Sequence, residues 1–354
     1  AGLPMRDMEM VQFHPTGLLA GSGTRMTGTV LEEGLRGAGG YLLNGDEQRF
    51  MESYDPRAER ATRDIVSRSI YSEMRAGRTS PNGGVYLKMA HLGPDKVRQQ
   101  FKGMVERCGD CGFDLAGGLV EVVPTAHYMM GGVVFQADCR TELHGLFAAG
   151  EDTGGVHGAN RLGGNGVANS TVFGGIAGDR MADWVQHEGA LRTPDEAALQ
   201  ASVTAHLAPF ELPGGDLEPI REALFDCMWQ DVGILRDAAG LERALQRLDE
   251  LDAQLARTGV VDGDRGFNLS WHDWLNLQSL IAVSRVIATS ALAREDSRGA
   301  HFREDFPKTG DLPGSTYIVV QQRGDALEMR REPVRFTRVA PGQTILEEAA
   351  VAMA

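Results

Sequence analysis

Residues 155 to 175 read "GVHGANRLGGNGVANSTVFGG", a run with many glycines and few large side chains. Because ordered glycine loses more backbone entropy than any other residue, such a run indicates a main chain that comes close to another group or adopts unusual dihedral angles. His157, Asn160, Arg161 and Asn165 stand among these glycines. We therefore expect a bound group to lie against this segment.

The size and charge of the chain limit what it does. Its 354 residues are too many for one ordinary core and predict two or three domains. Apolar residues make up 42% and charged residues 24%, which is typical of a globular protein; we expect no membrane span and no signal peptide. The net charge of -14 argues against nucleic-acid binding, although a buried site can still be locally basic.

The four cysteines are too few for a disulfide framework in a chain of this length. Cys108 and Cys111 form one C-x-x-C pair, which is half of a zinc site at most. Since no second pair follows, we interpret it as structural or incidental and predict no metal site.

Hydrophobic periodicity predicts several elements. An alternating strand over residues 8–13 is expected to stop at the "HPTG" that follows, and residues 57–77 predict a helix. Residues 119–150 are typical of short strands, the last of them "GLFAAGE". Residues 195–258 are helical in pattern, and two strands after Asp311 are expected to form a hairpin. A leucine stripe in the helical part indicates a bundle core: Leu241, Leu245, Leu248, Leu251 and Leu255.

The passage from "GLFAAGE" through the glycine run into "STVFGGIAGDRMADWV" is typical of part of a nucleotide-binding α/β unit. Such a domain normally opens with a strand, a G-x-G-x-x-G turn and a helix whose N-terminus receives a pyrophosphate. No such opening precedes this passage in the sequence. We therefore expect the chain to be a fragment or one half of a split protein.

Basic side chains recur beside turn-type residues in separate segments. Alone, each is more often a satisfied structural group. Together they predict one pocket for an anion, because an arginine fork binds a carboxylate with two bonds and a histidine can donate another. The residues are His14 in "QFHPTG", Glu33 and Arg36 in "LEEGLRGAGG", Arg63 in "TRDIVSRSI", His127 in "PTAHYMMGG" and Arg161 in "GANRLGGN".

Over nearly all of its length the chain resembles the flavoprotein subunits of succinate dehydrogenase and fumarate reductase. The motifs that carry the resemblance stand in the family's order: "VQFHPTG", "EGLRGAGG", "RDIVSRSI", "PTAHYMMGG", "GLFAAGE", "HGANRLGGN" and "SRGAHFREDFP". L-aspartate oxidase is a sister family, but "PTAHYMMGG" and "SRGAHFRED" are more similar to the succinate and fumarate enzymes.

The resemblance implies a multidomain α+β protein with FAD as its cofactor and a missing N-terminal flavin-binding segment. The expected parts are the end of the first FAD-domain segment at 1–12, a capping domain at 13–124, the second segment of a discontinuous Rossmann-like FAD domain at 125–184, a helical domain at 185–300 and a small C-terminal α+β domain at 301–354. It further implies an iron-sulfur subunit of a respiratory complex as partner, and a cytoplasmic location, peripheral at the inner face of the membrane.

The resemblance also implies roles for single residues. Arg63 matches the arginine that donates a proton to the substrate carbon during fumarate reduction, and Glu33 and Arg36 match the pair that relays protons to it. Residues matching the clamps on the two carboxylates of a dicarboxylate are His127 and Arg161 on one side and His14 on the other. Residues matching the flavin site are Glu151, which binds the ribose, and Gly150, Asn165 and Gly166.

Two positions depart from the family's pattern. Glu32 stands where the family usually has a threonine whose hydroxyl donates to a substrate carboxylate, and a second carboxylate there would repel the substrate unless it were protonated or turned away. Thr27 and Thr29 are alternative sources of the hydroxyl, and Arg25 is an alternative partner for Glu32. Ala38 replaces a glutamate in the family's "RGEGG".

Three functions stay open at this point. The first is interconversion of succinate and fumarate, or of a related dicarboxylate, by hydride transfer to or from FAD. The second is an amino-acid oxidase like L-aspartate oxidase. The third is a catalytically inert fragment that needs a complementary chain.

Overall fold

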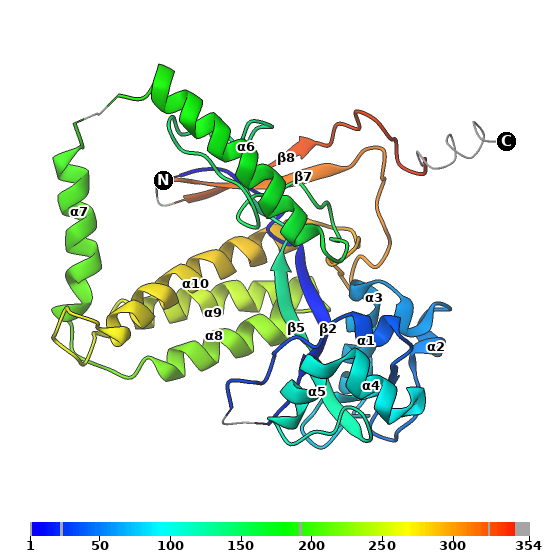
Figure 1. Ribbon diagram of the computed structural model, residues 1–354. Coiled ribbons are helices and arrows are strands. Elements are labelled where there is room, and N and C mark those ends of the chain that lie inside the picture. Colours follow the sequence, from blue (N-terminus) through cyan, green and yellow to red (C-terminus); the bar gives the residue numbers. More distant parts are fainter. Residues whose placement is uncertain (1, 22–23, 191–192, 325, 344–354) are drawn as a thin grey trace. The chain divides into compact units, whose positions relative to one another are not determined.

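The computed structural model describes residues 2–21, 24–190, 193–324 and 326–343. They form two compact units, which are described separately: unit 1 comprises residues 1–9, 131–156 and 167–354, and unit 2 comprises residues 10–130 and 157–166. Figure 1 labels the elements of both. The five domains implied by the family resemblance stay a prediction.

Unit 2 is built on a four-stranded antiparallel sheet with the strand order β2-β5-β4-β3. Its strands are β2 (Val11–Leu18), β3 (Tyr41–Leu43), β4 (Val85–Lys88) and β5 (Leu119–Met129). Its helices are α1 (Gly34–Gly37), α2 (Met51–Tyr54), η1 (Ala58–Arg60), α3 (Arg63–Arg75), η2 (Ala90–Leu92), α4 (Pro94–Gln100) and α5 (Lys102–Gly109). Helix α3 packs against β2 and β5, so its first turn lies beside the sheet.

Strand β2 corrects one sequence prediction, because it does not stop at "HPTG" but runs through it to Leu18. Two features make this possible. The strand lies at the edge of the sheet, and its register with β5 shifts between His14 and Gly17. An edge strand with a bulge tolerates Pro15, which has no N–H to donate.

The helix expected over residues 57–77 is also shorter than predicted. Ala61 and Thr62 have extended dihedral angles, with ψ of 163° and 155°. They separate the short turn η1 from α3, which begins at Arg63. As a result Arg63 is the first residue of a helix and not part of its middle.

Cys108 belongs to the hydrophobic core of unit 2 and is fully buried. Burial is the main cause that raises the pKa of the Cys108 thiol to about 12, and the neighbouring Cys111 adds to it. Both cysteines are free thiols. A thiol held protonated in a core fits a structural role for the C-x-x-C pair.

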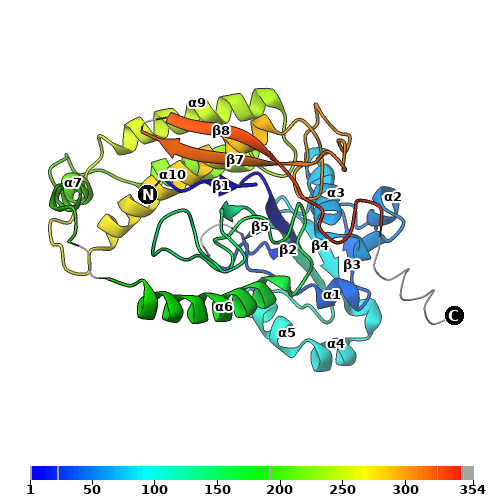
Figure 2. The ribbon, with the colours of Figure 1, turned by 90° about the horizontal axis from the view of Figure 1, so that it is seen from above.

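Unit 1 contains a second four-stranded sheet, with the order β6-β1-β7-β8. Its strands are β1 (Met5–Arg6), β6 (Gly132–Val133), β7 (Thr316–Arg323) and β8 (Ala326–Pro333). Its helices are α6 (Asn165–His187, which starts in unit 2), α7 (Glu196–Leu207), η3 (Ala208–Phe210), α8 (Glu218–Asp231), α9 (Ala238–Leu255) and α10 (Leu269–Ala293). The antiparallel pairing of β7 with β8 confirms the predicted hairpin, which Figure 2 shows beside the helices.

Helices α8, α9 and α10 pack together as the predicted bundle. Four leucines of the stripe on α9 are fully buried and Leu245 is half-buried. The 25 residues of helix α10 are long and apolar enough, by length and composition alone, to cross a membrane. The helix packs against α8, α9 and β7, as a core helix does, so the expectation of no membrane span stays a prediction.

The region after β5 differs from the short strands that were predicted. Beyond β6, the described residues up to Glu151 form no further strand, and "GLFAAGE" makes only an isolated bridge from Phe147 to Arg140. The turn that follows is well held. Gly150 has φ +93°, which favours glycine, and its carbonyl accepts bonds from Thr153 and Asn169.

Asp7 and Glu9, which follow β1, are linked through buried arginines to His301 of the "SRGAHFREDFP" segment. Nε of Arg294 donates to Glu9 at 2.5 Å, and Nη2 of Arg294 pairs with Asp7 at 3.3 Å. Nη1 of Arg236 donates to Nδ1 of His301 at 2.8 Å. Since arginine can only donate, Nδ1 is the accepting nitrogen of a neutral His301, and Nε2–H faces the carbonyl of Arg294 at 3.3 Å.

Candidate active site

Unit 2 contains all six side chains expected to handle an anion and its proton. They come from β2 (His14), the start of α1 (Glu33 and Arg36), the start of α3 (Arg63), β5 (His127) and the glycine run (Arg161). The rings of His14 and His127 lie 5.2 Å apart, edge to face. A Cβ placed on Gly163 would lie 2.8 Å from Oε2 of Glu33 and 3.4 Å from Nη2 of Arg63. The glycine run therefore passes directly over this ion pair.

The carboxylate of Glu33 lies between two guanidinium groups. Its Oε2 accepts from Nη2 of Arg63 at 2.7 Å, and its Oε1 accepts from Nη2 of Arg36 at 3.2 Å. Partial burial opposes ionisation of Glu33, but the bond and charge of Arg63, together with Arg36, outweigh it and lower its pKa. The guanidinium of Arg36 has a second contact, because its Nη1 donates to the main-chain carbonyl of Glu59 at 2.7 Å. These contacts form a continuous polar chain from Arg36 to Arg63.

His14 is buried and neutral. Burial, with the positive charges of Arg63 and Arg36 added, lowers the pKa of His14 to about 2. The backbone N–H of Thr16 donates to Nδ1 of His14 at 3.3 Å, so Nδ1 is the accepting nitrogen and Nε2 carries the proton. A neutral histidine with Nε2–H can donate one hydrogen bond to a carboxylate without adding charge.

A bulge in β5 determines the direction of His127. Gln12 pairs with Tyr128 and Phe13 with Ala126, which leaves His127 as the extra residue between them. Bulges of this kind redirect a side chain and occur beside active sites. Partial burial, followed by the charges of Arg63 and Arg161, lowers the pKa of His127. His127 is thus a second neutral donor.

Arg161 is buried and stacked. Its guanidinium carbon lies 4.2 Å from the centre of the Tyr128 ring, and its Nη1 donates to the carbonyl of Leu162 at 3.2 Å. The hydroxyl of Tyr128 lies 3.3 Å from Nε2 of His157. The glycine run therefore holds Arg161 against β5. That a bound group lies against the run stays a prediction.

The four residues expected at a flavin fall in both units. Gly150 and Glu151 belong to unit 1, where Glu151 is exposed at the end of the held turn. Asn165 and Gly166 belong to unit 2 and open the 23-residue helix α6. A Cβ on the neighbouring Gly164 would meet no atom within 4 Å. An exposed helix start with open space beside Gly164 is suited to an anionic or strongly polar group, whereas a Cβ on Gly166 would lie 2.9 Å from the Tyr128 ring.

Glu32 does not face the arginines. It is exposed, and its Oε1 lies 3.6 Å from the position of a Cβ on Gly34, beside the ring of Phe101. Among the described residues it forms no ion pair with Arg25. Thr27 donates to the carbonyl of Gly21 at 2.9 Å, so its hydroxyl is used within its own loop. Of the two possibilities for Glu32, the structure therefore shows the turned-away carboxylate.

Sequence reasoning assigned no role to three residues that hold this site: Gln12, Tyr128 and Gly163. Gln12 is fully buried on β2 and bonds to Arg63 and to the main chain of Arg161. Gln12 and Tyr128 stand inside strands, where no turn residue marks them. Gly163 is one of many glycines in the run, and the sequence alone does not distinguish it from the others. The alternation of β2 is the one signal that points to Gln12, because it places residues 12 and 14 on the same face.

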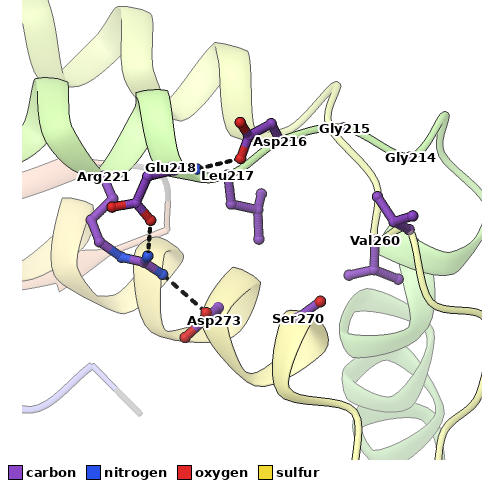
Figure 3. Close-up of a pocket in the computed structure, with 10 residues that line it drawn as sticks. Gly214, Gly215, Asp216, Leu217, Glu218, Arg221, Val260, Ser270 and Asp273 are labelled. Atoms are coloured by element: carbon purple, nitrogen blue, oxygen red, sulfur yellow. Dashed lines mark hydrogen bonds and ion pairs between the residues drawn. The ribbon is translucent and has the colours of Figure 1, made fainter. Parts of the chain in front are cut away.

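A cavity of about 540 Å³ lies in unit 1, at the starts of α8 and α10 (Figure 3). Among the described residues that line it, Arg221 is the one arginine, and it is already paired with Glu218 and, at 3.1 Å, with Asp273. Since Asp216 adds a third carboxylate, the lining carries excess negative charge. It is therefore poorly suited to a dicarboxylate.

The chain matches two family models and several known proteins. A model described as an FAD binding domain matches residues 1–167, and one described as the fumarate reductase flavoprotein C-terminal region matches residues 221–346. The fumarate reductase (CoM/CoB) of Methanothermobacter marburgensis has a subunit that is 42% identical, over 87% of this chain and 56% of its own length. L-aspartate oxidase of Caulobacter vibrioides is 35% identical, over 94% of this chain and 57% of its own length.

The fold is similar to solved structures as well. The FrdA chain of an Escherichia coli quinol fumarate reductase variant superimposes with a TM-score of 0.85 at 31% identity, covering 97% of this chain and 61% of its own. This likeness confirms the predicted mixture of helices and sheets. The chain spans a little more than half the length of the curated relatives that it matches.

Proposed function

Because the chain belongs to the succinate dehydrogenase and fumarate reductase flavoprotein family, we propose that it carries the dicarboxylate site of an oxidoreductase that interconverts succinate and fumarate. FAD is the cofactor of this family, and when bound it takes up or supplies the hydride. We also propose that turnover needs a complementary flavin-binding segment, since the relatives are longer than this chain.

The residues present fit part of a flavin site. Gly150 adopts a dihedral angle that favours glycine, and the exposed carboxylate of Glu151 follows it, where it can accept from ribose hydroxyls. In unit 2 the exposed start of α6, whose first residues are Asn165 and Gly166, is the positive end of the helix dipole and favours an anionic group such as a phosphate. These groups would bind and orient FAD.

The carboxylates of the substrate would bind to the basic side chains of unit 2. Arg161 and His127 would hold one carboxylate, and Nε2–H of His14 would donate to the other. Because both histidines are neutral, the net positive charge of the site comes from the arginines alone. The three arginines would attract a dianionic substrate. Because the two histidines add no positive charge, the dicarboxylate product would not be bound too tightly to leave.

One observation carries the proposal: Arg63, Glu33 and Arg36 form a hydrogen-bonded line of groups that can pass a proton, with both arginines buried and Glu33 partly exposed. Arg63 would donate a proton to the substrate carbon during fumarate reduction, and the reverse reaction would return it. A guanidinium normally stays protonated, so its proton must be replaced at once. Glu33 contacts both arginines and is the group able to do this.

The partners and location are also proposed. Relatives and solved neighbours include flavoprotein subunits of quinol-linked fumarate reductases. We propose that an iron-sulfur subunit binds the complete flavoprotein and connects it to the membrane, so that the flavoprotein is a cytoplasmic peripheral protein.

The test is a titration of the purified chain with FAD and then with succinate, followed by visible flavin absorbance. Binding of FAD and bleaching by succinate would support the proposal. Bleaching by aspartate but not by succinate would support an amino-acid oxidase instead. If FAD does not bind, the same titration is repeated with the chain joined to a flavin-binding segment of a relative, and absence of bleaching there would contradict the proposal.

A further inference from the structure

Gln12 connects Arg63 and Arg161, which lie far apart in the sequence. Its side chain is fully buried on β2. Its Oε1 accepts from Nη1 of Arg63 at 3.0 Å. Its Nε2 donates to the main-chain carbonyl of Arg161 at 2.7 Å and to Oδ1 of Asn160 at 3.1 Å. All the polar atoms of one amide thus bond to groups beside the proposed substrate.

The orientation of this amide is determined by its neighbours. A guanidinium only donates, so an oxygen must face Arg63, and a carbonyl only accepts, so the NH2 group must face Arg161. Nδ2 of Asn160 in turn donates to the carboxylate of Asp64 at 2.8 Å, which leaves its Oδ1 to accept from Gln12. Neither a hydrocarbon nor a carboxylate of the same size can make this set of bonds.

The other contacts of Arg63 show why the bond matters. Its Nη2 is bound to Glu33, while its buried Nε has no hydrogen-bond partner among the described residues. Two contacts, one to Glu33 and one to Gln12, therefore fix the plane of the guanidinium. Removing the contact to Gln12 leaves the group free to rotate about the bond to Glu33.

We infer that Gln12 is a positioning residue, which holds the guanidinium of Arg63 and the main chain of Arg161 in one fixed relation to each other. This inference rests on the proposed function, in which Arg63 donates the proton and Arg161 holds the carboxylate. Gln12 contacts neither the substrate nor the flavin in this role. It ensures that both arginines act on the same bound dicarboxylate.

The test uses two variants of the FAD-loaded flavoprotein that contains this chain. In Gln12→Met the shape is kept and every hydrogen bond is lost, so we expect kcat for fumarate reduction to fall about 100-fold, the cost of a small misplacement of a reacting group. The dissociation constant for malonate, a non-reacting dicarboxylate measured by calorimetry, should rise about 10-fold, because Arg161 loses its main-chain support.

In Gln12→Glu the pH profile separates positioning from general stability. A protonated carboxyl has one O–H donor and one carbonyl acceptor, so it can replace the amide towards Arg161 and Arg63. The ionised carboxylate has no donor. We therefore expect activity relative to wild type to rise as pH falls in Gln12→Glu, while Gln12→Met shows no such recovery.

Asn44→Asp is the matched control, since Asn44 is another buried amide of unit 2 and bonds to Glu73 away from these arginines. Its activity should change only in proportion to the fraction of folded protein. Wild-type kcat and malonate affinity in Gln12→Met, or a pH profile of Gln12→Glu parallel to wild type, would overturn the inference alone. A wild-type flavoprotein that neither binds malonate nor reduces fumarate would overturn the proposed function, and this role with it.

Discussion

The guanidinium of Arg63 and the carboxylate of Glu33 form an ion pair with an N–O distance of 2.7 Å, inside a site that also contains Arg36 and Arg161. Glu33 bonds to two of these arginines, so its carboxylate is placed to accept a proton from one and release it to the other. Because the contacts with Arg63 and Arg36 lower its pKa, Glu33 is ionised at neutral pH and ready to accept. In the proposed mechanism, substrate binding and proton delivery are therefore carried by different groups.

Glu33→Gln should remove proton delivery and keep binding. The amide retains the shape and one acceptor but cannot carry a proton, so we expect kcat for fumarate reduction to fall by about 100-fold or more. Malonate affinity should change little, since no carboxylate contact is lost. Steady-state kinetics and calorimetry measure the two effects. Glu73→Gln is the control, because it removes a different glutamate of unit 2 that is paired with an arginine, Arg78, at 2.6 Å. Equal losses in both variants would show that Glu33 has no special role.

Gly163→Ala tests whether the glycine run must lie close to this ion pair. The added Cβ would lie 2.8 Å from Oε2 of Glu33, so this oxygen, at the end of a flexible and partly exposed side chain, must shift and its bond to Arg63 is disturbed. We expect a loss of turnover that is smaller than that of Glu33→Gln, because the carboxylate is displaced and not removed. Gly37→Ala is matched, since a Cβ there meets nothing within 4 Å. Full activity in Gly163→Ala would mean that this close approach is not needed.

The stack between Tyr128 and Arg161 should contribute to substrate affinity. Tyr128→Leu removes the ring that lies 4.2 Å from the guanidinium. A cation–π contact of about 1–2 kcal/mol corresponds to a rise in KM of about 5- to 30-fold. Tyr128→Phe keeps the ring and loses only the hydroxyl near His157, so its KM should stay near wild type. If both variants raise KM equally, the hydroxyl and not the stack holds Arg161.

Much of this site could be predicted from the sequence because its charged residues stand beside turn residues. His14, Arg36, Arg63 and Arg161 stand next to or near glycine, proline or a helix start, and their recurrence in separate segments, rather than any one of them, indicates a shared pocket. Gln12 and Tyr128 lie inside strands, and only the sheet shows what they contact. The direction of His127 depends on a bulge, which no short pattern encodes.

Two elements that the sequence predicts differ in the structure, the strand at "GLFAAGE" and the helix over residues 57–77, and both differences have a physical reason. The apolar run in "GLFAAGE" has strand propensity, but a strand forms only where neighbouring strands pair with it. Among the described residues this run makes a single bridge, from Phe147 to Arg140. The helical pattern of residues 57–77 includes Thr62, which the chain uses in an extended conformation to start α3. Hydrophobic periodicity does not predict such helix and strand boundaries, because they depend on the backbone conformation of single residues.

The burial of neutral His14 should make unit 2 sensitive to acid. Its pKa is about 2 when folded and about 6.5 when unfolded, so below pH 6.5 the unfolded chain binds a proton that the folded chain does not. The free energy of unfolding should therefore fall as pH falls, by about 2 kcal/mol from this group between pH 7 and pH 5. Hydrogen exchange of the β2 and β5 amides measures it, with His14→Gln as the comparison; an equal acid loss in both proteins would contradict this assignment.

Unit 1 should show the opposite dependence on pH through Asp7. Burial, together with the nearby charge of Glu9, raises the pKa of Asp7 to about 7, and Arg294 only partly offsets this. The unfolded carboxyl ionises near 3.8. The folded protein therefore holds a proton that the unfolded chain has released, and stability present at low pH is lost as pH rises towards 7.

Asp7→Asn should flatten this dependence. Asparagine tolerates the positive φ of +53° at this position, and its Oδ1 can still accept from Arg294 and from the N–H of Ile318. The slope of the unfolding free energy between pH 5 and pH 8 should become less negative by up to about 1.4 kcal/mol per pH unit. All four tryptophans lie in unit 1, so their fluorescence reports its unfolding. Asp226→Asn, at an exposed carboxylate on α8, is the control and should have the wild-type slope. If Asp7→Asn also has the wild-type slope, the proton retained by the folded protein is bound by another group.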